Sequence, residues 1–222
     1  MNEDNFYNNI YTELQSKGLQ GWFHSKSHKS LENKIVNRNA KEKSPFILEV
    51  GGNIGEHIKY VRSSFAKYLL TDLREINFIS NDSRVSFECL DVQHIPYPDN
   101  TFDRVICTCL LHHVENLNLA LKEMLRVTKK DGTISILLPC DPGLVYRVAK
   151  VIGPNRVWRK HGILNPSFFH YSQHRNHFPG IKSSIKEIYF NEKIHWKYWP
   201  LKFSSWNLNM FTVVTIEKLS NK

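Results

Sequence analysis

The sequence predicts an α/β protein with a seven-stranded, mostly parallel sheet that is covered by helices on both faces. Short apolar runs alternate with segments of helical periodicity between residues 45 and 140, as expected for strand–helix–strand units. A glycine-rich turn follows the first apolar run, and an apolar run rich in β-branched residues lies close to the C-terminus. No internal repeat or low-complexity tract divides the chain, so we expect one domain over residues 1–222.

The N-terminal segment, residues 2–40, is predicted to be polar and helical. Gly18 and Gly21 are expected to interrupt it, and its apolar anchors are Leu14, Leu19, Trp22 and Phe23. Two placements stay open: a cap formed by residues 1–40 over the mouth of a ligand site, or a helix packed on the sheet edge.

The central elements follow from hydrophobic periodicity. They are strand 45–50, helix 55–66, strand 68–73, a short helical connection 74–81, strand 84–91, strand 103–111, helix 116–129 and strand 132–139. A further helix is predicted within 142–160, and its apolar face consists of Leu144, Val148, Val151 and Ile152. Residues 161–183 are rich in histidine and aromatic side chains and are expected to face a substrate, and strands are expected at 184–190 and 210–218.

Residues 47–57 are the most informative stretch of the chain and read Ile-Leu-Glu-Val-Gly-Gly-Asn-Ile-Gly-Glu-His. A strand, a glycine turn and a helical pattern in this order are typical of the start of a Rossmann-type unit, in which glycines let the backbone approach a ligand closely. Asn53 occupies the middle glycine position of the dinucleotide pattern, and Glu49 would repel a pyrophosphate. The turn therefore favours a ligand without phosphates.

Three consecutive predicted strands end in an acid, namely Glu49, Asp72 and Asp91. The acid at the tip of the second strand is the position that holds ribose hydroxyls in such folds. The three carboxylates together suit a ligand that has a ribose, an exocyclic amine and a cationic tail.

These motifs resemble those of class I S-adenosylmethionine-dependent methyltransferases. Glu49-x-Gly51-x-Asn53-x-Gly55 resembles the first motif of that family, although Asn53 stands where the family usually has glycine. Asp72 matches its ribose-binding acid. Further matches, in chain order, are Asp91 with 95–97 and 100–103, then 110–114, then 121–132, so that the resemblance covers roughly residues 45–140.

The resemblance implies a Rossmann-like sheet whose last strand is antiparallel, and S-adenosylmethionine as the cofactor. It divides the chain into an N-terminal helical cap at 1–40, a cofactor-binding core at 45–140, a substrate-facing segment at 141–206 and the last strand at 207–222. The implied cofactor-binding residues are Glu49, Gly51, Gly52, Asn53, Gly55, Asp72, Asp91, Val92 and Cys109. For Glu49 and Asp91, helix or loop capping is the alternative role.

Histidines are the candidate proton acceptors, because neutral histidine is the usual base near pH 7. The candidates are His112 and His113 at the end of the fourth strand, and His174 in the insertion. A structural or pocket-lining role is the alternative for the first two. His170, Arg175 and His177 are the candidate substrate-binding residues. We expect no metal site here, because no carboxylate occurs between residues 143 and 186.

The net charge of +9 is concentrated in one segment. Residues 143–202 hold 11 Lys and Arg residues against 2 acids, whereas the rest of the chain is balanced. A basic substrate-facing segment favours an anionic acceptor, and a merely solvated face is the alternative. The aromatic residues Trp196, Trp199 and Trp206 are expected to pack at the core edge, or else to form a platform for a sugar or a lipid tail.

The sequence thus predicts a methyltransferase that acts on an O or N atom of a small, polar, anionic acceptor, such as a sugar or nucleotide-sugar in glycan synthesis. The alternatives are a nucleic-acid or phospholipid methyltransferase and a non-catalytic binding protein. Nucleic acid is disfavoured because 110–114 read Leu-Leu-His-His-Val rather than a base-flipping motif, whereas basic residues in 143–160 leave peripheral membrane contact open. Without a leader, a long apolar stretch or CxxC spacing, the expected location is cytoplasmic, and the oligomeric state stays open.

Overall fold

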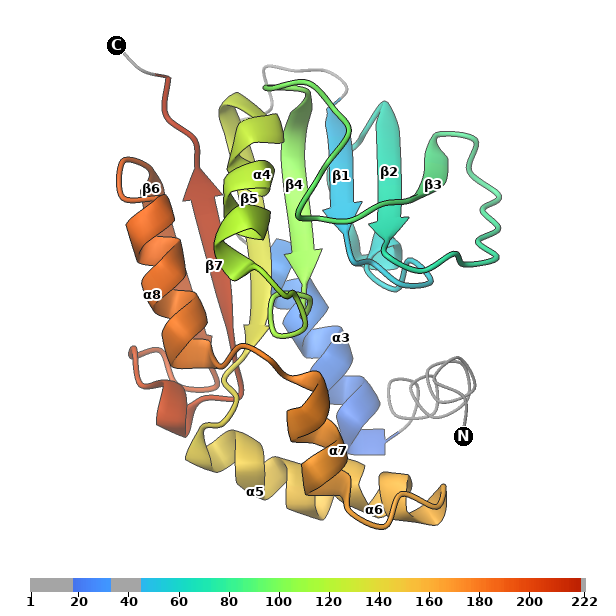
Figure 1. The fold of residues 1–222 in the computed structure, drawn as a ribbon, viewed down its shortest axis with the longest axis vertical. Coiled ribbons are helices and arrows are strands. Elements are labelled where there is room, and N and C mark those ends of the chain that lie inside the picture. Colours follow the sequence, from blue (N-terminus) through green and yellow to red (C-terminus); the bar gives the residue numbers. More distant parts are fainter. Residues whose placement is uncertain (1–17, 33–44, 221–222) are drawn as a thin grey trace.

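The computed structural model describes residues 18–32 and 45–220, which form a seven-stranded mixed sheet in the order β3-β2-β1-β4-β5-β7-β6 (Figure 1). β1 to β5 pair in parallel, whereas β7 pairs antiparallel with both β5 and β6. The predicted sheet and its antiparallel last strand are therefore confirmed. The strands are β1 Phe46–Val50, β2 Lys67–Asp72, β3 Val85–Cys89, β4 Phe102–Thr108, β5 Thr128–Pro139, β6 Lys193–Trp199 and β7 Phe211–Glu217.

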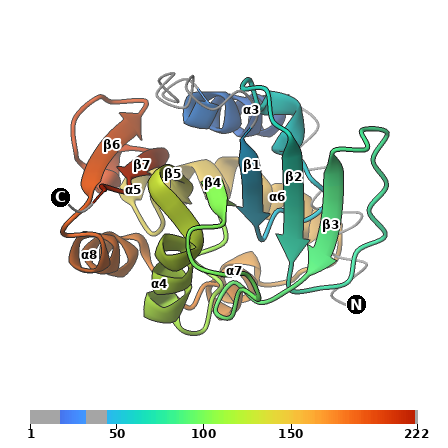
Figure 2. The same cartoon turned by 90° about the horizontal axis from the view of Figure 1, so that it is seen from above.

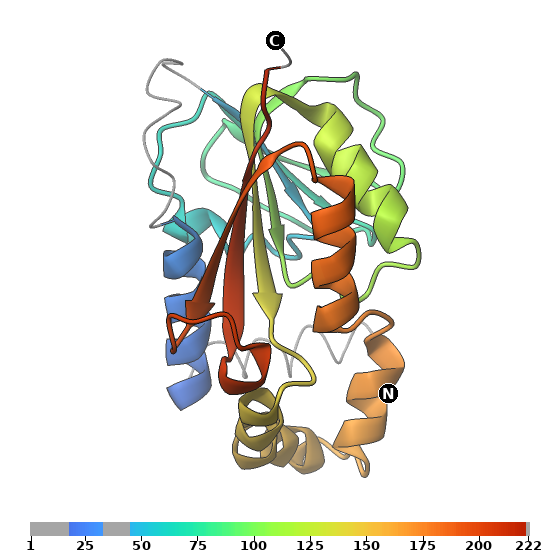
Figure 3. The ribbon, with the colours of Figure 1, turned by 90° about the vertical axis from the view of Figure 1, so that its left-hand side faces the viewer.

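Helices cover both faces of the sheet, as predicted. α3 (Gly18–Glu32) lies on one face, and α4 (Leu117–Val127) and α8 (Phe178–Ile188) lie on the other (Figures 2 and 3). Three further helices, α5 (Leu144–Ile152), α6 (Pro154–Lys160) and α7 (Pro166–Gln173), lie beyond the carboxyl ends of the parallel strands (Figure 1). The ligand-binding edge of a parallel sheet is therefore the edge that these three helices approach.

Helix α4 forms where the hydrophobic periodicity predicted a helix. Ala120, Leu121, Met124 and Val127 form its buried stripe, and the Asn116 side chain caps its first turn by accepting from the Leu119 N–H at 3.0 Å. An amphipathic stripe and a side-chain cap specify the same helix, which explains why the prediction succeeded.

Two predicted helices are absent from the described residues. The prediction of a helix over 55–66 is wrong, because the chain forms turns and a single 3-10 turn, η3 (Ile58–Tyr60), before Val61 becomes extended. Its β-branched residues and the pair Ser63–Ser64 have weak helix propensity, and His57 is drawn into a buried network under α3. The connection 74–81 is likewise irregular rather than helical.

The prediction of a strand over 184–190 is also wrong. Residues 184–188 belong to α8, which buries Phe178, Ile181 and Ile185 on one face and has Pro179 in its first turn, and residues 189–190 form a turn. The sheet takes its remaining strand from β6 instead. Its residues Trp196 and Trp199 pack at the sheet edge, and Trp199 stacks on Phe211 with ring centroids 5.3 Å apart.

The described part of the N-terminal segment is one continuous helix, so the expected interruption at Gly21 is wrong. α3 contacts β5, β7 and η3 and buries Leu31 and Glu32, which favours packing on the sheet over a detached cap. Its first turns also reach the α5–α6 junction, where a Cβ added to Gly153 would lie 2.6 Å from Gln20 Nε2. Leu14, the rest of residues 2–17, residues 33–40 and the side chain of Leu19 lie outside the described residues.

The helix predicted over 142–160 breaks at Gly153 into α5 and α6, and Pro154 begins the second helix. The predicted apolar face of α5 exists, but it points to solvent rather than into the core. Within the described residues, no helix is both long and apolar enough to cross a membrane.

Candidate active site

The candidate site begins where β1 and β4 lie side by side, because the strand order reverses there. Gly51 and Gly55 have φ angles of 62° and 79°, and Asn53 has φ 47°. These are left-handed conformations, which asparagine tolerates better than most residues. Asn53 therefore keeps the turn geometry although it replaces the usual glycine.

Asp72, the predicted ribose acid, is held in place by its neighbours. One carboxylate oxygen accepts the Asn53 N–H at 3.1 Å, and the other accepts the Arg74 N–H at 3.1 Å and Nε at 3.2 Å. Arg74 also donates to the Asn53 side-chain oxygen at 3.2 Å. A carboxylate has about four acceptor positions, so it still has capacity for a ligand hydroxyl. Sequence reasoning missed Arg74, although a base two residues after an acid is a visible signal.

Glu49 lies buried directly before the glycine turn. Its Oε2 accepts from the Tyr68 hydroxyl at 2.6 Å, whereas Oε1 has no hydrogen-bond partner among the described residues. Burial raises the pKa of the Glu49 carboxyl, against the opposing effects of His57 and Tyr68. An unsatisfied buried acceptor is costly, so Glu49 is well suited to a donor group above it.

Asp91 lies two residues after the end of β3, and it makes hydrogen bonds within its own loop. It accepts the Gln93 N–H at 2.9 Å and the Gln93 side-chain amide, whose oxygen in turn accepts from Asn116 N at 2.7 Å. Val92 is buried beside it. Cys109 has φ 55°, and burial raises the pKa of its thiol to about 12, which keeps it protonated.

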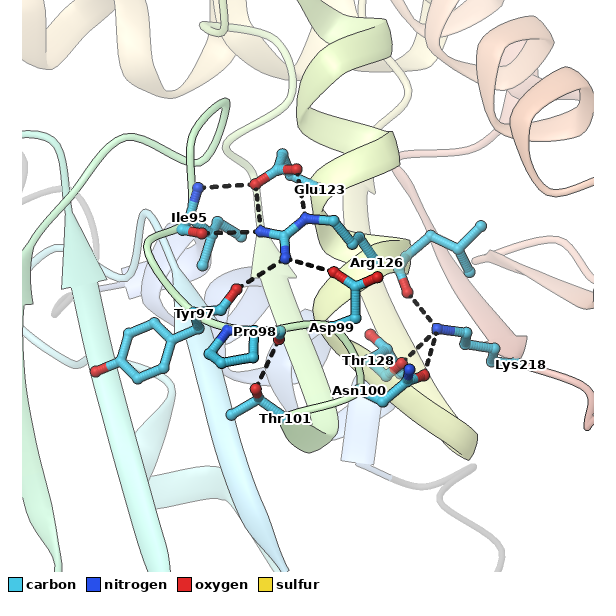
Figure 4. Close-up of polar contacts among 11 residues, drawn as sticks. Ile95, Tyr97, Pro98, Asp99, Asn100, Thr101, Glu123, Arg126, Thr128 and Lys218 are labelled. Carbon is cyan, nitrogen blue, oxygen red and sulfur yellow. Dashed lines mark hydrogen bonds and ion pairs between the residues drawn. The ribbon is translucent and has the colours of Figure 1, made fainter.

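The loop after Asp91 is anchored to α4 by one arginine (Figure 4). Arg126 donates to the carbonyl oxygens of Ile95 at 2.9 Å and Tyr97 at 2.8 Å, and it pairs with Glu123 at 2.7 Å. Glu123 in turn accepts the Ile95 N–H at 2.9 Å. The pair therefore fixes the loop that the family resemblance assigns to the adenine side.

A second group of side chains gathers around Asp141, just after β5. Asp141 is fully buried, and its Oδ2 accepts from His170 Nε2 and His174 Nδ1, both at 2.9 Å. Burial opposes ionisation, but hydrogen bonds from the two histidines hold the pKa of Asp141 well below its usual range. Sequence reasoning missed Asp141 because it lies just before the segment that was searched for a carboxylate.

The Asp141 contact leaves Nε2 of His174 as the acceptor nitrogen of that ring. The His174 ring centroid lies 5.1 Å from that of His112 and 4.8 Å from that of His113. Burial lowers the pKa of His174, against the effect of Asp141, so the ring is neutral near pH 7. The rings of the three candidate bases, His174, His112 and His113, therefore lie next to one another.

His112 and His113 differ in their surroundings. His112 is fully buried, and neither ring nitrogen has a partner among the described residues. His113 is exposed, and its Nδ1 donates to the Gln173 carbonyl at 2.9 Å, which leaves Nε2 as an acceptor. Asn176 joins the two segments by donating to the carbonyl oxygens of Leu111 and Val114.

Lys150 of α5 is a further buried group near Asp141 that the sequence did not single out. It is 6% exposed, and its ammonium lies 4.7 Å from the ring centre of Tyr171. Burial lowers the pKa of Lys150 to about 8, against the attraction of Asp141.

Arg175 and His177 lie apart from this cluster, at the rim. Arg175 donates to Glu115 at 2.9 Å, with both side chains largely exposed. Together with His177 they line a shallow hollow between the first turns of α4 and α8. Of the predicted substrate residues, only His170 shares the buried cluster.

The comparison with protein families agrees with this geometry. Residues 48–136 match the family model described as a methyltransferase domain. This region forms a class I methyltransferase domain. The acceptor capacity of Asp72, the unsatisfied oxygen of Glu49 and the left-handed turn all fit S-adenosylmethionine, the cofactor of such domains.

Similar proteins share the domain and the fold. The rat mitochondrial arginine-hydroxylase NDUFAF5 is 33% identical over 94 residues, which are 40% of this chain and 27% of that protein. The ubiquinone/menaquinone biosynthesis C-methyltransferase UbiE of Cellvibrio japonicus is 40% identical over 57 residues, 26% of this chain and 25% of that protein. A solved S-adenosylmethionine-dependent methyltransferase from Thermotoga maritima has a TM-score of 0.59 at 14% identity and covers 96% of both chains. The chain thus spans about a quarter of the length of these two curated relatives.

Proposed function

We propose that this protein transfers a methyl group from S-adenosylmethionine to an O or N atom of a small, polar, anionic acceptor. A sugar or nucleotide-sugar of glycan synthesis is the acceptor class we favour. The observation that carries the proposal is that two sets of residues follow strand ends at the same edge of the sheet, its carboxyl edge. One is the glycine turn with Asp72, and the other is the histidine cluster around Asp141.

The first set serves binding. Asp72 would accept from ribose hydroxyls, Asp91 and Val92 would line the adenine side, and Glu49 would order the turn below the cationic end. When bound, S-adenosylmethionine supplies an electrophilic methyl group, so the protein has to position the acceptor and manage its proton.

The second set serves proton removal. His174 Nε2 would take the proton of the acceptor hydroxyl or amine as that O or N atom bonds to the methyl carbon, while the bond from this carbon to the sulfonium sulfur breaks and its electron pair stays on sulfur. Asp141 is a positioning residue, because its contact with Nδ1 fixes the ring and its tautomer and favours the imidazolium that results. His113 is the second candidate base. The buried His112 ring lies beside the His174 ring, and we assign it a supporting role.

The basic segment supports an anionic acceptor. Between residues 142 and 186 the chain has eight Lys and Arg residues and no acid, and this span contains His170 and His174 of the histidine cluster. Lys150 reaches the cluster, whereas Arg175 and His177 are placed to meet the acceptor at the rim.

A labelled-methyl transfer assay with a panel of nucleotide-sugars, neutral sugars and vesicle-borne phospholipids tests this function. In Asp141→Asn and His174→Gln we expect kcat to fall by about 100-fold while S-adenosylmethionine binding is unchanged. His195→Gln, on β6 away from the cluster, is the matched control. In the wild type the rate should stay constant between pH 7 and 8 and fall at acid pH, since burial lowers the pKa of His174 below its usual value of 6.5.

The proposal fails if both cluster variants keep the wild-type rate and pH profile. It also fails if hydroxylation rather than methyl transfer is found, a result that the similarity to an arginine-hydroxylase makes worth testing.

A further inference from the structure

Helix α5 exposes its apolar side chains to solvent and buries a lysine. Its four large apolar side chains, Leu144, Val148, Val151 and Ile152, are 51%, 50%, 61% and 57% exposed. Lys150 of the same helix is 6% exposed and faces the interior. A surface helix of a globular protein normally shows the reverse pattern, with its apolar stripe toward the core.

Further large apolar side chains are exposed on the neighbouring elements. Leu164, between α6 and α7, is 95% exposed, and Phe168 of α7 is 72% exposed. The helices α5, α6 and α7 contact one another in sequence and form the end of the molecule beyond the sheet (Figures 1 and 3). We call this surface the α5–α7 end. Large exposed apolar side chains that gather at one end of a molecule indicate a site of interaction.

The charge around the α5–α7 end identifies the partner. Arg147, Arg156 and Arg159 are all exposed on α5 and α6, and no acid occurs anywhere between residues 142 and 186. A second copy of this chain would bring like charges together across the same surface. An amphipathic helix with an apolar stripe and basic flanks is the arrangement that binds an anionic bilayer.

We propose that the α5–α7 end docks on the surface of an anionic lipid bilayer. The apolar side chains of α5 and α7 enter the interfacial region, and the arginines of α5 and α6 meet the lipid phosphates. Docking would turn the histidine cluster toward the membrane, because His170 and His174 belong to α7 and its C-terminal cap. A lipid-anchored acceptor is then the substrate class, and this last step rests on the proposed function.

Vesicle flotation tests the docking without any need for methyl transfer. The full chain is mixed with vesicles of phosphatidylcholine, or of equal parts phosphatidylcholine and phosphatidylglycerol. We expect binding to the anionic vesicles that weakens at high salt, and little binding to the neutral ones. Val148→Ser/Val151→Ser should weaken binding by about tenfold or more.

Two matched control variants, one apolar and one charged, distinguish binding through this surface from nonspecific binding. Ile79→Ser/Phe190→Ser removes two apolar side chains that are 81% and 73% exposed on other parts of the surface, and it should bind as the wild type does. Arg156→Glu/Arg159→Glu should abolish binding, whereas Lys122→Glu/Lys130→Glu makes the same charge change at exposed lysines outside the α5–α7 end and should preserve most of it. All eight substituted positions are exposed, so circular dichroism should report a folded protein in every variant.

Absence of vesicle binding at low salt overturns the proposal. Equal loss of binding in a test variant and its control also overturns it. Binding would then depend on net charge, or on exposed apolar side chains in general, rather than on the α5–α7 end. A self-association that Val148→Ser/Val151→Ser abolishes, with no vesicle binding, would assign the surface to a second copy instead. If docking is confirmed but no methyl transfer occurs, the proposed function fails and the docking stands.

Discussion

A buried charge network joins α3 to the sheet, and Glu32 is its centre. The Glu32 carboxylate accepts from Arg104 Nη2 at 2.8 Å and from His57 Nε2 at 2.9 Å, and both partners are buried. His28 meets the other side of the His57 ring at 2.8 Å. The variant Glu32→Gln keeps the shape of the side chain but removes its charge, which leaves the Arg104 guanidinium buried without a counterion.

The expected cost follows from the pKa of Glu32. Burial alone would raise this pKa, but His57 and Arg104 lower it from 4.5 to about 2. Because the folded-state pKa lies below the unfolded value, the stabilisation is complete above pH 4.5 and is lost as the pH falls toward 2. The shift corresponds to about 3 kcal/mol at pH 7, in line with the roughly 3–5 kcal/mol for breaking a buried ion pair.

Urea unfolding of the wild type and Glu32→Gln from pH 7 downward measures this contribution. The difference in unfolding free energy should be about 3 kcal/mol at pH 7 and should narrow by roughly 2 kcal/mol at pH 3. Taking the difference removes the contributions of other acids such as Asp141, which titrate in both proteins. Glu187→Gln, at an exposed position on α8, should change the free energy by less than about 0.5 kcal/mol.

Two results would refute this reasoning. A loss of under about 1 kcal/mol at pH 7 would mean that the network contributes no net stability, as some buried ion pairs do not. A difference that stays constant with pH would mean that Glu32→Gln acts through packing rather than through charge.

Two further predictions concern the substrate segment. Arg175→Ala should raise the KM for the acceptor by roughly five- to tenfold at low salt and much less at high salt, because Arg175 is exposed; an unchanged KM at low salt would remove it from the site. Elemental analysis should find no stoichiometric metal, since Asp141 already holds His170 and His174 at hydrogen-bond distance. Tightly bound zinc, with activity lost on chelation, would show instead that these three residues are ligands.

The sequence predicted the sheet well because each core strand is a short apolar run with a clear end. It failed where local pattern and tertiary context disagree. Residues 184–190 alternate like a strand over seven positions, but the stripe Phe178, Ile181 and Ile185 shows a helix once the window is longer. The helix expected over 55–66 was lost because its residues are poor helix formers and His57 serves the Glu32 network, which no local pattern could reveal.

The residues proposed to bind the cofactor could be selected from the sequence because they follow strand ends. The histidine cluster was predictable only in part, since its acid, Asp141, comes from the end of β5 and meets α7 only in the folded chain. The orientation of α5 could not be predicted at all. Periodicity identified its apolar face, but not that this face would be turned away from the core.

The central claim is that the glycine turn and Asp72 bind S-adenosylmethionine. Isothermal titration calorimetry of the wild type and Asp72→Ala, with S-adenosylmethionine, its demethylated product and NAD, tests it most directly. We predict that both adenosyl compounds bind, that NAD does not, and that Asp72→Ala weakens binding by about 1.5–3 kcal/mol through loss of a charged acceptor. Tight binding of NAD without binding of S-adenosylmethionine would contradict the account.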